Sequence, residues 1–126
     1  MAQLIIDSSD LIEMTENQKI WSDSIDRILS VGVSLQPYGV SNFALSRSSA
    51  LDVLSQFAEL RIGVLGGDVY VKNKNYFEST CDNWCIEPMM DDSNDDYVYQ
   101  SIRKSREFIE RYQLDDAYFA LVPKLE

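Results

Sequence analysis

A long segment near the C-terminus, with apolar residues at helical spacing, constrains the fold of this chain more than any other feature. Val98, Ile102, Ser105, Ile109 and Tyr112 follow one another at intervals of four, three, four and three residues. This pattern predicts an α-helix over residues 94–112, with Ser93 as its N-cap. Because only one side of the helix is apolar, that side must pack against a sheet or other helices in a layered domain.

Two further helices are expected in the first half of the chain. Thr15 and Gln18 fit a capping box, and the apolar residues behind them run at helical spacing to Gly32, which fits a C′ glycine. We therefore expect a helix over residues 17–31. Residues 32–45 contain a proline and two glycines and are expected to be a connection.

The next helix is expected to begin at Ser46 or Ser48. Its apolar stripe consists of Ala50, Leu51, Leu54, Phe57 and Ala58.

The strands are expected between and after these helices. Residues 61–72 are rich in β-branched residues around Gly66-Gly67, which indicates either two short strands joined by a tight turn or one strand bent at a glycine bulge. In both cases the glycines and Asp68 have a structural role, with Asp68 hydrogen-bonded to nearby backbone. Residues 73–75 suit a hairpin turn before a return strand over residues 76–86.

Residues 117–122 form an apolar, β-prone run stopped by Pro123, as expected of a central or penultimate strand. The element order is then ααβββαβ. It predicts an α+β domain with an antiparallel sheet of about four strands and three helices mainly on one face.

Composition limits the partners of the chain. With 126 residues and 45% hydrophobic side chains, the chain is expected to form one domain over residues 1–126, with residues 1–16 as a peripheral segment. Its 11 Lys and Arg against 21 Asp and Glu give a net charge of −10. This charge argues against nucleic acid and anionic membranes as partners and favours a basic protein. The start lacks the features of a secretory signal, and we expect a cytoplasmic protein.

The residue types also limit the chemistry. The chain has no His, so Ser and Cys nucleophiles lack an imidazole partner. Cys81 and Cys85 are expected to be reduced, partly buried thiols, because on a strand their spacing places the Cα atoms too far apart for a disulfide. Two thiolates without His also cannot complete a zinc site. The acidic run after Met90 fails the calcium-loop pattern, because Tyr97 stands in place of the turn glycine. Its carboxylates suit a helix N-terminus, and Glu107 and Arg111 form a favourable i,i+4 pair on the same helix. We expect no catalytic residue, metal or cofactor.

The remaining feature is the distribution of charge. Residues 75–102 contain seven acidic residues and no Lys or Arg, interleaved with five aromatic residues. Aromatic side chains are common energetic anchors at interfaces, and charge steers association. The candidate binding residues are Glu78, Asp82, Trp84, Glu87, Asp91 and Asp92. The alternative is a solvated face whose aromatic residues lie in the core.

Several short motifs together resemble a known family. They are Ile25-Asp26-Arg27-Ile28-Leu29, Ala44-Leu45, Ala50-Leu51, Val64-Leu65-Gly66-Gly67-Asp68-Val69-Tyr70, Asp82-Asn83-Trp84, Ser101-Ile102, Phe108-Ile109, Tyr112, Tyr118-Phe119 and Leu121-Val122. Over about residues 20–123 the sequence resembles the immunity protein 40 family of bacterial polymorphic-toxin systems. The Gly-Gly-Asp-Val-Tyr and Asp-Asn-Trp elements carry most of the resemblance.

The resemblance implies a cytoplasmic, non-enzymatic protein that binds the C-terminal effector domain of a toxin encoded beside it and thereby prevents self-killing. Two alternatives stay open from the residues alone. One is a small enzyme whose carboxylates hold a divalent metal. The other is a general acidic adaptor or nucleic-acid mimic without a single cognate partner.

Overall fold

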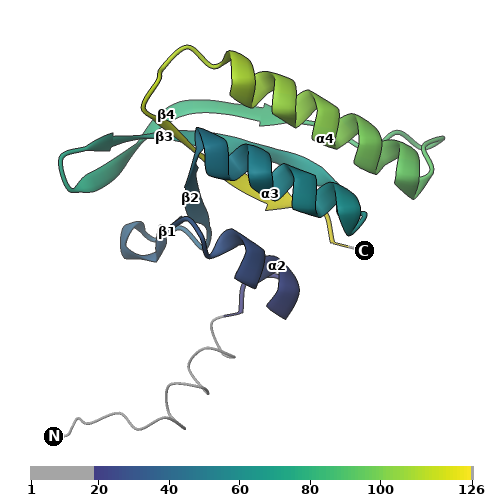
Figure 1. The fold of residues 1–126 in the computed structure, drawn as a ribbon, viewed down its shortest axis with the longest axis horizontal. Coiled ribbons are helices and arrows are strands. Elements are labelled where there is room, and N and C mark those ends of the chain that lie inside the picture. The colour runs from purple at the N-terminus through teal and green to yellow at the C-terminus, as the bar shows by residue number, and fades with distance from the viewer. Residues whose placement is uncertain (1–18, 126) are drawn as a thin grey trace, which may run out of the picture.

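A five-stranded antiparallel sheet forms the centre of the protein. The computed structural model describes residues 19–125 (Figure 1). In spatial order the strands are β1 (Val33–Ser34), β2 (Phe43–Ser46), β5 (Ala117–Pro123), β3 (Val64–Asn73) and β4 (Tyr76–Cys85). Every neighbouring pair is antiparallel. The predicted α+β class is confirmed, and β5 lies in the middle of the sheet.

The helices pack mainly on one face of this sheet. They are α2 (Asp23–Leu29), α3 (Arg47–Glu59) and α4 (Asn94–Arg111), with a short 3-10 helix, η1 (Gln36–Tyr38). In Figure 1, α3 and α4 lie side by side across the sheet, while α2 lies beyond α3. Serine hydroxyls cap α3 and α4 as expected, because Ser46 accepts from the Ser49 N–H and Ser93 from the Asp96 N–H.

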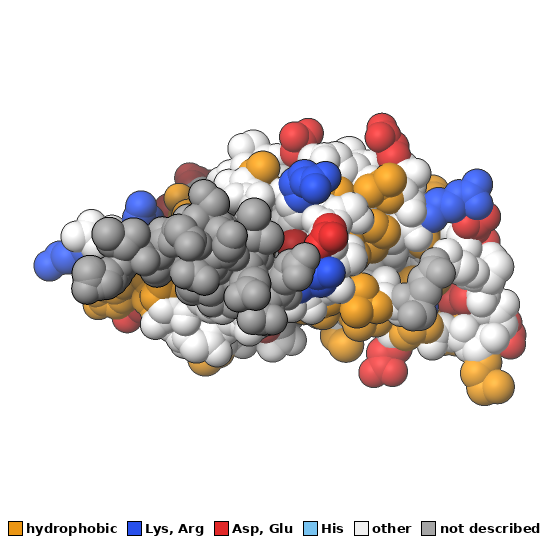
Figure 2. Space-filling model, turned by 90° about the horizontal axis from the view of Figure 1, so that it is seen from below, with side chains coloured by type: hydrophobic (Ala, Val, Ile, Leu, Met, Phe, Trp, Pro, Cys, Tyr) orange, Lys and Arg blue, Asp and Glu red, His pale blue; other side chains and the backbone are white. Residues whose placement is uncertain are grey.

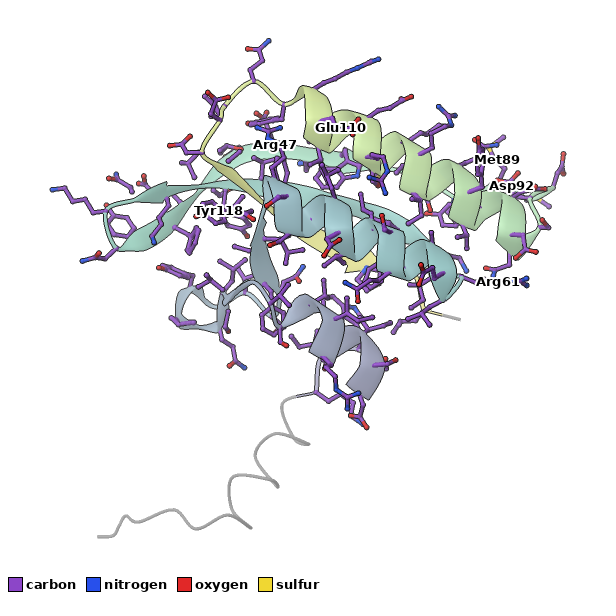
Figure 3. All side chains as sticks on the ribbon, viewed as in Figure 1. Arg47, Arg61, Met89, Asp92, Glu110 and Tyr118 are labelled. Carbon is purple, nitrogen blue, oxygen red and sulfur yellow. The ribbon has the colours of Figure 1, made fainter. Side chains whose placement is uncertain are left out.

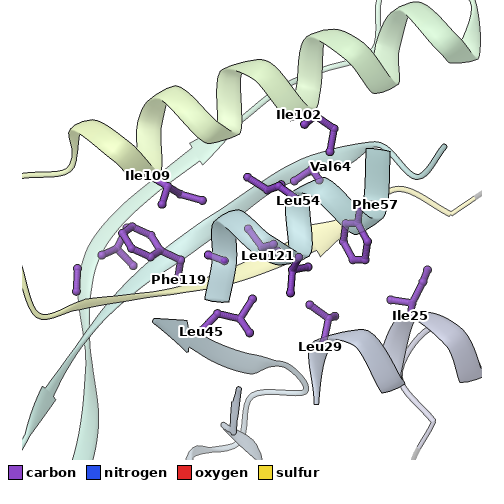
Figure 4. Packing of buried hydrophobic residues seen from close by; sticks show 14 of the residues in the cluster. Ile25, Leu29, Leu45, Leu54, Phe57, Val64, Ile102, Ile109, Phe119 and Leu121 are labelled. Carbon is purple, nitrogen blue, oxygen red and sulfur yellow. The ribbon is translucent and has the colours of Figure 1, made fainter. Parts of the chain in front are cut away.

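The main core lies between the helices and the covered face of the sheet. Figure 4 shows side chains from all three helices and from β2, β3 and β5 meeting in one layer. The largest fully buried ones include Phe57, Leu54, Ile109, Phe119 and Leu121. The helical spacing at the C-terminus therefore predicted the buried face of α4 correctly, since Val98, Ile102, Ser105 and Ile109 are all buried.

A smaller cluster covers part of the opposite face of the sheet. It consists of Leu35, Ala44, Tyr70, Phe77 and Ala120. The Phe77 N–H donates to the Tyr38 hydroxyl at 3.1 Å, and the two rings meet edge to face. The segment around η1 therefore closes the second face where β4 begins.

Residues 32–45 were wrongly expected to be only a connection. They contain β1 and most of β2, so the sheet has five strands instead of about four, and the described order is αββαββαβ instead of ααβββαβ. Strands of two and four residues are too short to show a clear alternation of apolar and polar residues, and the nearby proline and two glycines indicate a loop instead.

The first described helix is shorter than predicted. It begins after Ser22, which accepts from the Ile25 N–H at 3.1 Å, and ends at Leu29. The predicted capping box at Thr15 and Gln18 and the predicted peripheral segment 1–16 lie outside the described residues.

Gly32 does not terminate α2 as a left-handed C′ residue. A Cβ atom there would lie 2.6 Å from the Ala44 carbonyl oxygen, so the close approach of β2 requires glycine.

The Gly66-Gly67 pair lies within one strand, which confirms the bulge and excludes the two-strand alternative. The register of β3 against β5 shifts between Val64 and Gly66. Gly66 has a φ of 149°, a backbone conformation that residues with a Cβ atom rarely adopt. The expected backbone hydrogen bond of the Asp68 carboxylate is not found within residues 19–125, because this side chain points away from the core and is exposed.

Candidate partner-binding surface

The six predicted binding residues do not form one patch. Glu78 lies near the hairpin that joins β3 to β4, and Asp82 lies halfway along β4. Glu87, Asp91 and Asp92 lie in the connection from β4 to α4, at the opposite end of the sheet (Figure 1). The acidic stretch therefore follows the full length of the edge strand.

One face of the molecule illustrates how the charges are dispersed. Figure 2 shows Lys and Arg side chains and hydrophobic side chains separating the Asp and Glu side chains on that face. A net charge of −10 thus does not make the whole surface acidic.

Trp84 packs beneath α4 and is only partly exposed. Its ring stacks on Phe108 with 4.6 Å between ring centroids, and its Nε1–H donates to the buried Ser105 hydroxyl at 2.9 Å. On β3, the opposing residue is Gly67, where a Cβ atom would lie 2.4 Å from the Trp84 ring. These contacts explain why the sequence has Gly67 opposite Trp84, and they describe a packing role for the indole.

Asp82 belongs to a bulge in β4. Asp68 pairs with Asn83 and Tyr70 with Ser79, so residues 80–82 stand opposite Val69 alone. Side chains satisfy the bulged backbone: the Cys81 N–H donates to the Ser79 hydroxyl and the Asp82 N–H to the Thr80 hydroxyl, at 3.0 and 3.1 Å.

Tyr112 joins this bulge to the C-terminal end of α4. Its hydroxyl donates to Asp82 Oδ2 at 2.6 Å. Because this bond requires the phenol proton, it raises the pKa of Tyr112. Burial and the negative charge of Asp82 also raise this pKa, whereas the contact with Thr80 lowers it.

An open groove of about 640 Å³ runs between the bulge and α4. It is lined by Asp82, Lys104, Glu107, Phe108, Arg111, Tyr112, Gln113 and Leu114. Glu107 is paired with Arg103 at 3.2 Å and not with Arg111 as predicted. Its lining combines Phe108 and Leu114 with charged side chains of both signs. Sequence reasoning missed it, because its residues come from two elements whose packing no local pattern reveals.

The connection after β4 forms the second distinct surface. Its N-terminal end is fixed where the Ile86 N–H donates to the Leu65 carbonyl and the Tyr97 hydroxyl donates to the Ile86 carbonyl, at 2.8 and 2.5 Å. Burial and the nearby Cys85 and Glu87 raise the pKa of Tyr97. We call residues 87–92 the acidic turn.

The acidic turn carries two exposed methionines. Met89 is 69% exposed and Met90 fully exposed. Figure 3 shows Met89 and Asp92 at the same end of the molecule as Arg61, far from the Tyr118 end of the sheet. Sequence reasoning did not select these methionines, since an apolar pair beside a proline is equally compatible with burial in the core.

The sequence left open whether the aromatic residues of the acidic stretch are exposed for binding or buried in the core, and the structure shows both. Phe77 and Tyr97 are buried, Trp84 is partly buried, and Tyr76 and Tyr99 are 46% and 68% exposed. Core packing therefore explains about half of them.

Both cysteines are free but exposed, so the expected partial burial is wrong. Cys81 is exposed because it lies in the bulge, with a φ of 68°, and Cys85 because it is on the face of the sheet away from the helices. Among residues 19–125, no three His, Cys, Asp or Glu side chains are placed to hold a metal ion. No helix in this part of the chain is long and apolar enough to cross a membrane.

Comparison with known proteins gives one result. No curated protein and no solved structure matched the sequence. A family model, Immunity protein 40, matches residues 34–123, which include β2, α3, the Gly66-Gly67 bulge, Trp84, the acidic turn, α4 and β5. Since this match covers most of the chain and includes most of the packed core and both surfaces described above, the protein belongs to the immunity protein 40 family.

Proposed function

We propose that this protein neutralises a cognate toxin by binding its effector domain directly, with the acidic turn as the principal contact. The family implies an immunity protein and hence a toxin partner. The supporting observation is that Glu87 and Asp91 are exposed at one end of the molecule, together with Asp95 and Asp96 in the first turn of α4. Such a surface attracts a basic effector domain and accelerates its association.

The other predicted residues have different parts in this proposal. Asp82 and Glu78 lie further along β4 and add to the attraction at longer range. Trp84 packs against Phe108 and Ser105 in the second half of α4 and supports the fold. The protein acts in the cytoplasm by occlusion and transforms no substrate.

The first experiment tests neutralisation. The effector domain encoded next to this chain is expressed with and without the protein, and growth is measured. We expect growth to be restored by the protein and not by an equally expressed unrelated acidic domain. Cell death despite abundant folded protein, or substrate turnover by the purified protein, would contradict the proposal.

A second experiment tests the surface. Glu87→Lys with Asp91→Lys reverses two exposed charges of the acidic turn, and Asp115→Lys with Asp116→Lys makes the same change of charge at the other end of α4. We expect the first pair to slow association with the effector domain about tenfold or more at low salt and to flatten its salt dependence. The second pair should have a much smaller effect, and equal effects would exclude the acidic turn as the principal contact.

A further inference from the structure

Met89 and Met90 have exposures that local packing does not explain. Met89 is 69% exposed and Met90 is 102% exposed, and neither belongs to the buried core. We propose that these two methionines are the apolar anchors of the interface and insert into an apolar recess rimmed by Lys and Arg on the effector domain. This inference rests on the proposed function and adds to it the residues and the surface chemistry of the partner.

The methionines are presented on a fixed turn. The Asp92 N–H donates to the Met89 carbonyl at 3.1 Å, and the Met89 N–H donates in return to Asp92 Oδ2 at 3.3 Å. Directly after this turn, Ser93 caps α4. A segment already ordered before association loses little conformational entropy on binding, so buried apolar area contributes more fully to affinity.

Methionine is suited to this position. Its unbranched, polarisable side chain adapts to an irregular recess, and methionines are frequent on surfaces that bind other proteins. Two adjacent methionines at the tip of a turn are able to enter one recess together. A single exposed apolar residue elsewhere on the surface buries less apolar area in such a recess.

The charges around the methionines define the partner. Glu87, Asp91, Asp95 and Asp96 surround them in sequence, and within residues 19–125 only one ion pair reaches this group, from Arg61 to Asp95 at 3.6 Å. A recess that accepts the methionines must therefore bring positive charges to its rim. A second copy of this chain fits poorly, because it would place like charges together.

The groove at Asp82 is a weaker candidate for this contact. It presents Lys104 and Arg111 against Asp82 and Glu107, so its charges do not select a basic partner. Its exposed Leu114 provides a matched control, since this residue is 45% exposed and lies at the other end of α4.

The experiment measures the affinity of the full chain for the inactivated effector domain encoded beside it. Met89→Ser with Met90→Ser should weaken binding about a hundredfold, as expected when two anchor residues are lost. Met89→Leu with Met90→Leu keeps the apolar volume and should stay within a few-fold of the wild type. Leu114→Ser with Val31→Ser removes two exposed apolar residues elsewhere and should do the same.

Each outcome is decisive. Wild-type affinity in the serine pair would overturn the inference while the proposed function stands. A greater loss in the Leu114 and Val31 pair would overturn the inference and would also exclude the acidic turn as the principal contact, while neutralisation by direct binding stands. Self-association of the wild type that the serine pair abolishes would overturn it as well. Failure of the wild type to bind the effector domain would overturn the proposed function itself. Urea unfolding of all variants, with midpoints matching the wild type, establishes that the losses come from the interface.

Discussion

The acidic turn begins three residues after Trp84 in the sequence, yet the two have opposite environments. Trp84 stacks beneath α4 against Phe108, whereas Met90 is fully exposed a few residues later. Both belong to one acidic, aromatic-rich stretch that composition alone treats as uniform. The difference shows that a charged segment is able to contain a core residue and an exposed surface in immediate succession, and that stability and binding should be separable by mutation.

The largest expected effect is on the packed side of this comparison. Trp84→Ala removes the stacked ring and leaves the Ser105 hydroxyl without its partner, and should lower the free energy of unfolding by about 3 kcal/mol. Met90→Ala should change it by less than about 0.5 kcal/mol. Urea denaturation at neutral pH measures both, and similar midpoints for the two variants would abolish the distinction.

A smaller effect is expected from the residue opposite Trp84. Gly67→Ala places a methyl group 2.4 Å from the indole and 2.6 Å from the Ala120 carbonyl oxygen, and should cost about 2 kcal/mol. Combined with Trp84→Ala, the same substitution should cost less, because one of the two clashes is gone. Additive effects in this double-mutant cycle would show that the ring and Gly67 are not in close contact.

Ser105→Ala should have a still smaller effect. It leaves the Trp84 Nε1–H without an acceptor in a partly buried site and should cost about 1 kcal/mol. Gln100→Ala, on the exposed side of the same helix, provides the control. A shift of the melting temperature in the control as large as in Ser105→Ala would show that the indole hydrogen bond contributes nothing specific.

The smallest expected effect is a loss of stability at alkaline pH that arises from Tyr97, whose hydroxyl contacts the backbone between Trp84 and the acidic turn. Burial, with the charges of Cys85 and Glu87, raises the pKa of Tyr97, whose hydroxyl donates to the Ile86 carbonyl at 2.5 Å and lies 3.1 Å from the Val64 carbonyl. The folded state then holds the Tyr97 proton more tightly than the unfolded chain does. The contribution of this proton to the free energy of unfolding is therefore complete below about pH 10 and is lost as the pH rises through the pKa of the folded state.

Urea midpoints between pH 8 and 11 should fall less steeply for Tyr97→Phe than for the wild type. Parallel profiles for the two proteins would exclude Tyr97 as a source of the alkaline loss.

Features that are set within one element were predictable from the sequence, and the features that were missed depend on contacts between elements. Ser93 and the buried face of α4 were predictable because capping and helical spacing are set within the helix itself. Gly32 was misinterpreted because its cause is the carbonyl of Ala44 on another strand. The acidic residues share one stretch of sequence, but their division between the Asp82 groove and the acidic turn depends on how β4 extends along α4, which no local pattern indicates.

The bulge at residues 80–82 has a consequence for how this protein behaves when it accumulates. β4 is the outer strand of the sheet, and a long, regular outer strand invites pairing with the same strand of another molecule. The extra residues interrupt that strand, and the hydroxyls of Ser79 and Thr80 occupy two of its backbone N–H groups. The bulge and these two hydrogen bonds therefore disfavour pairing of β4 with the same strand of another molecule.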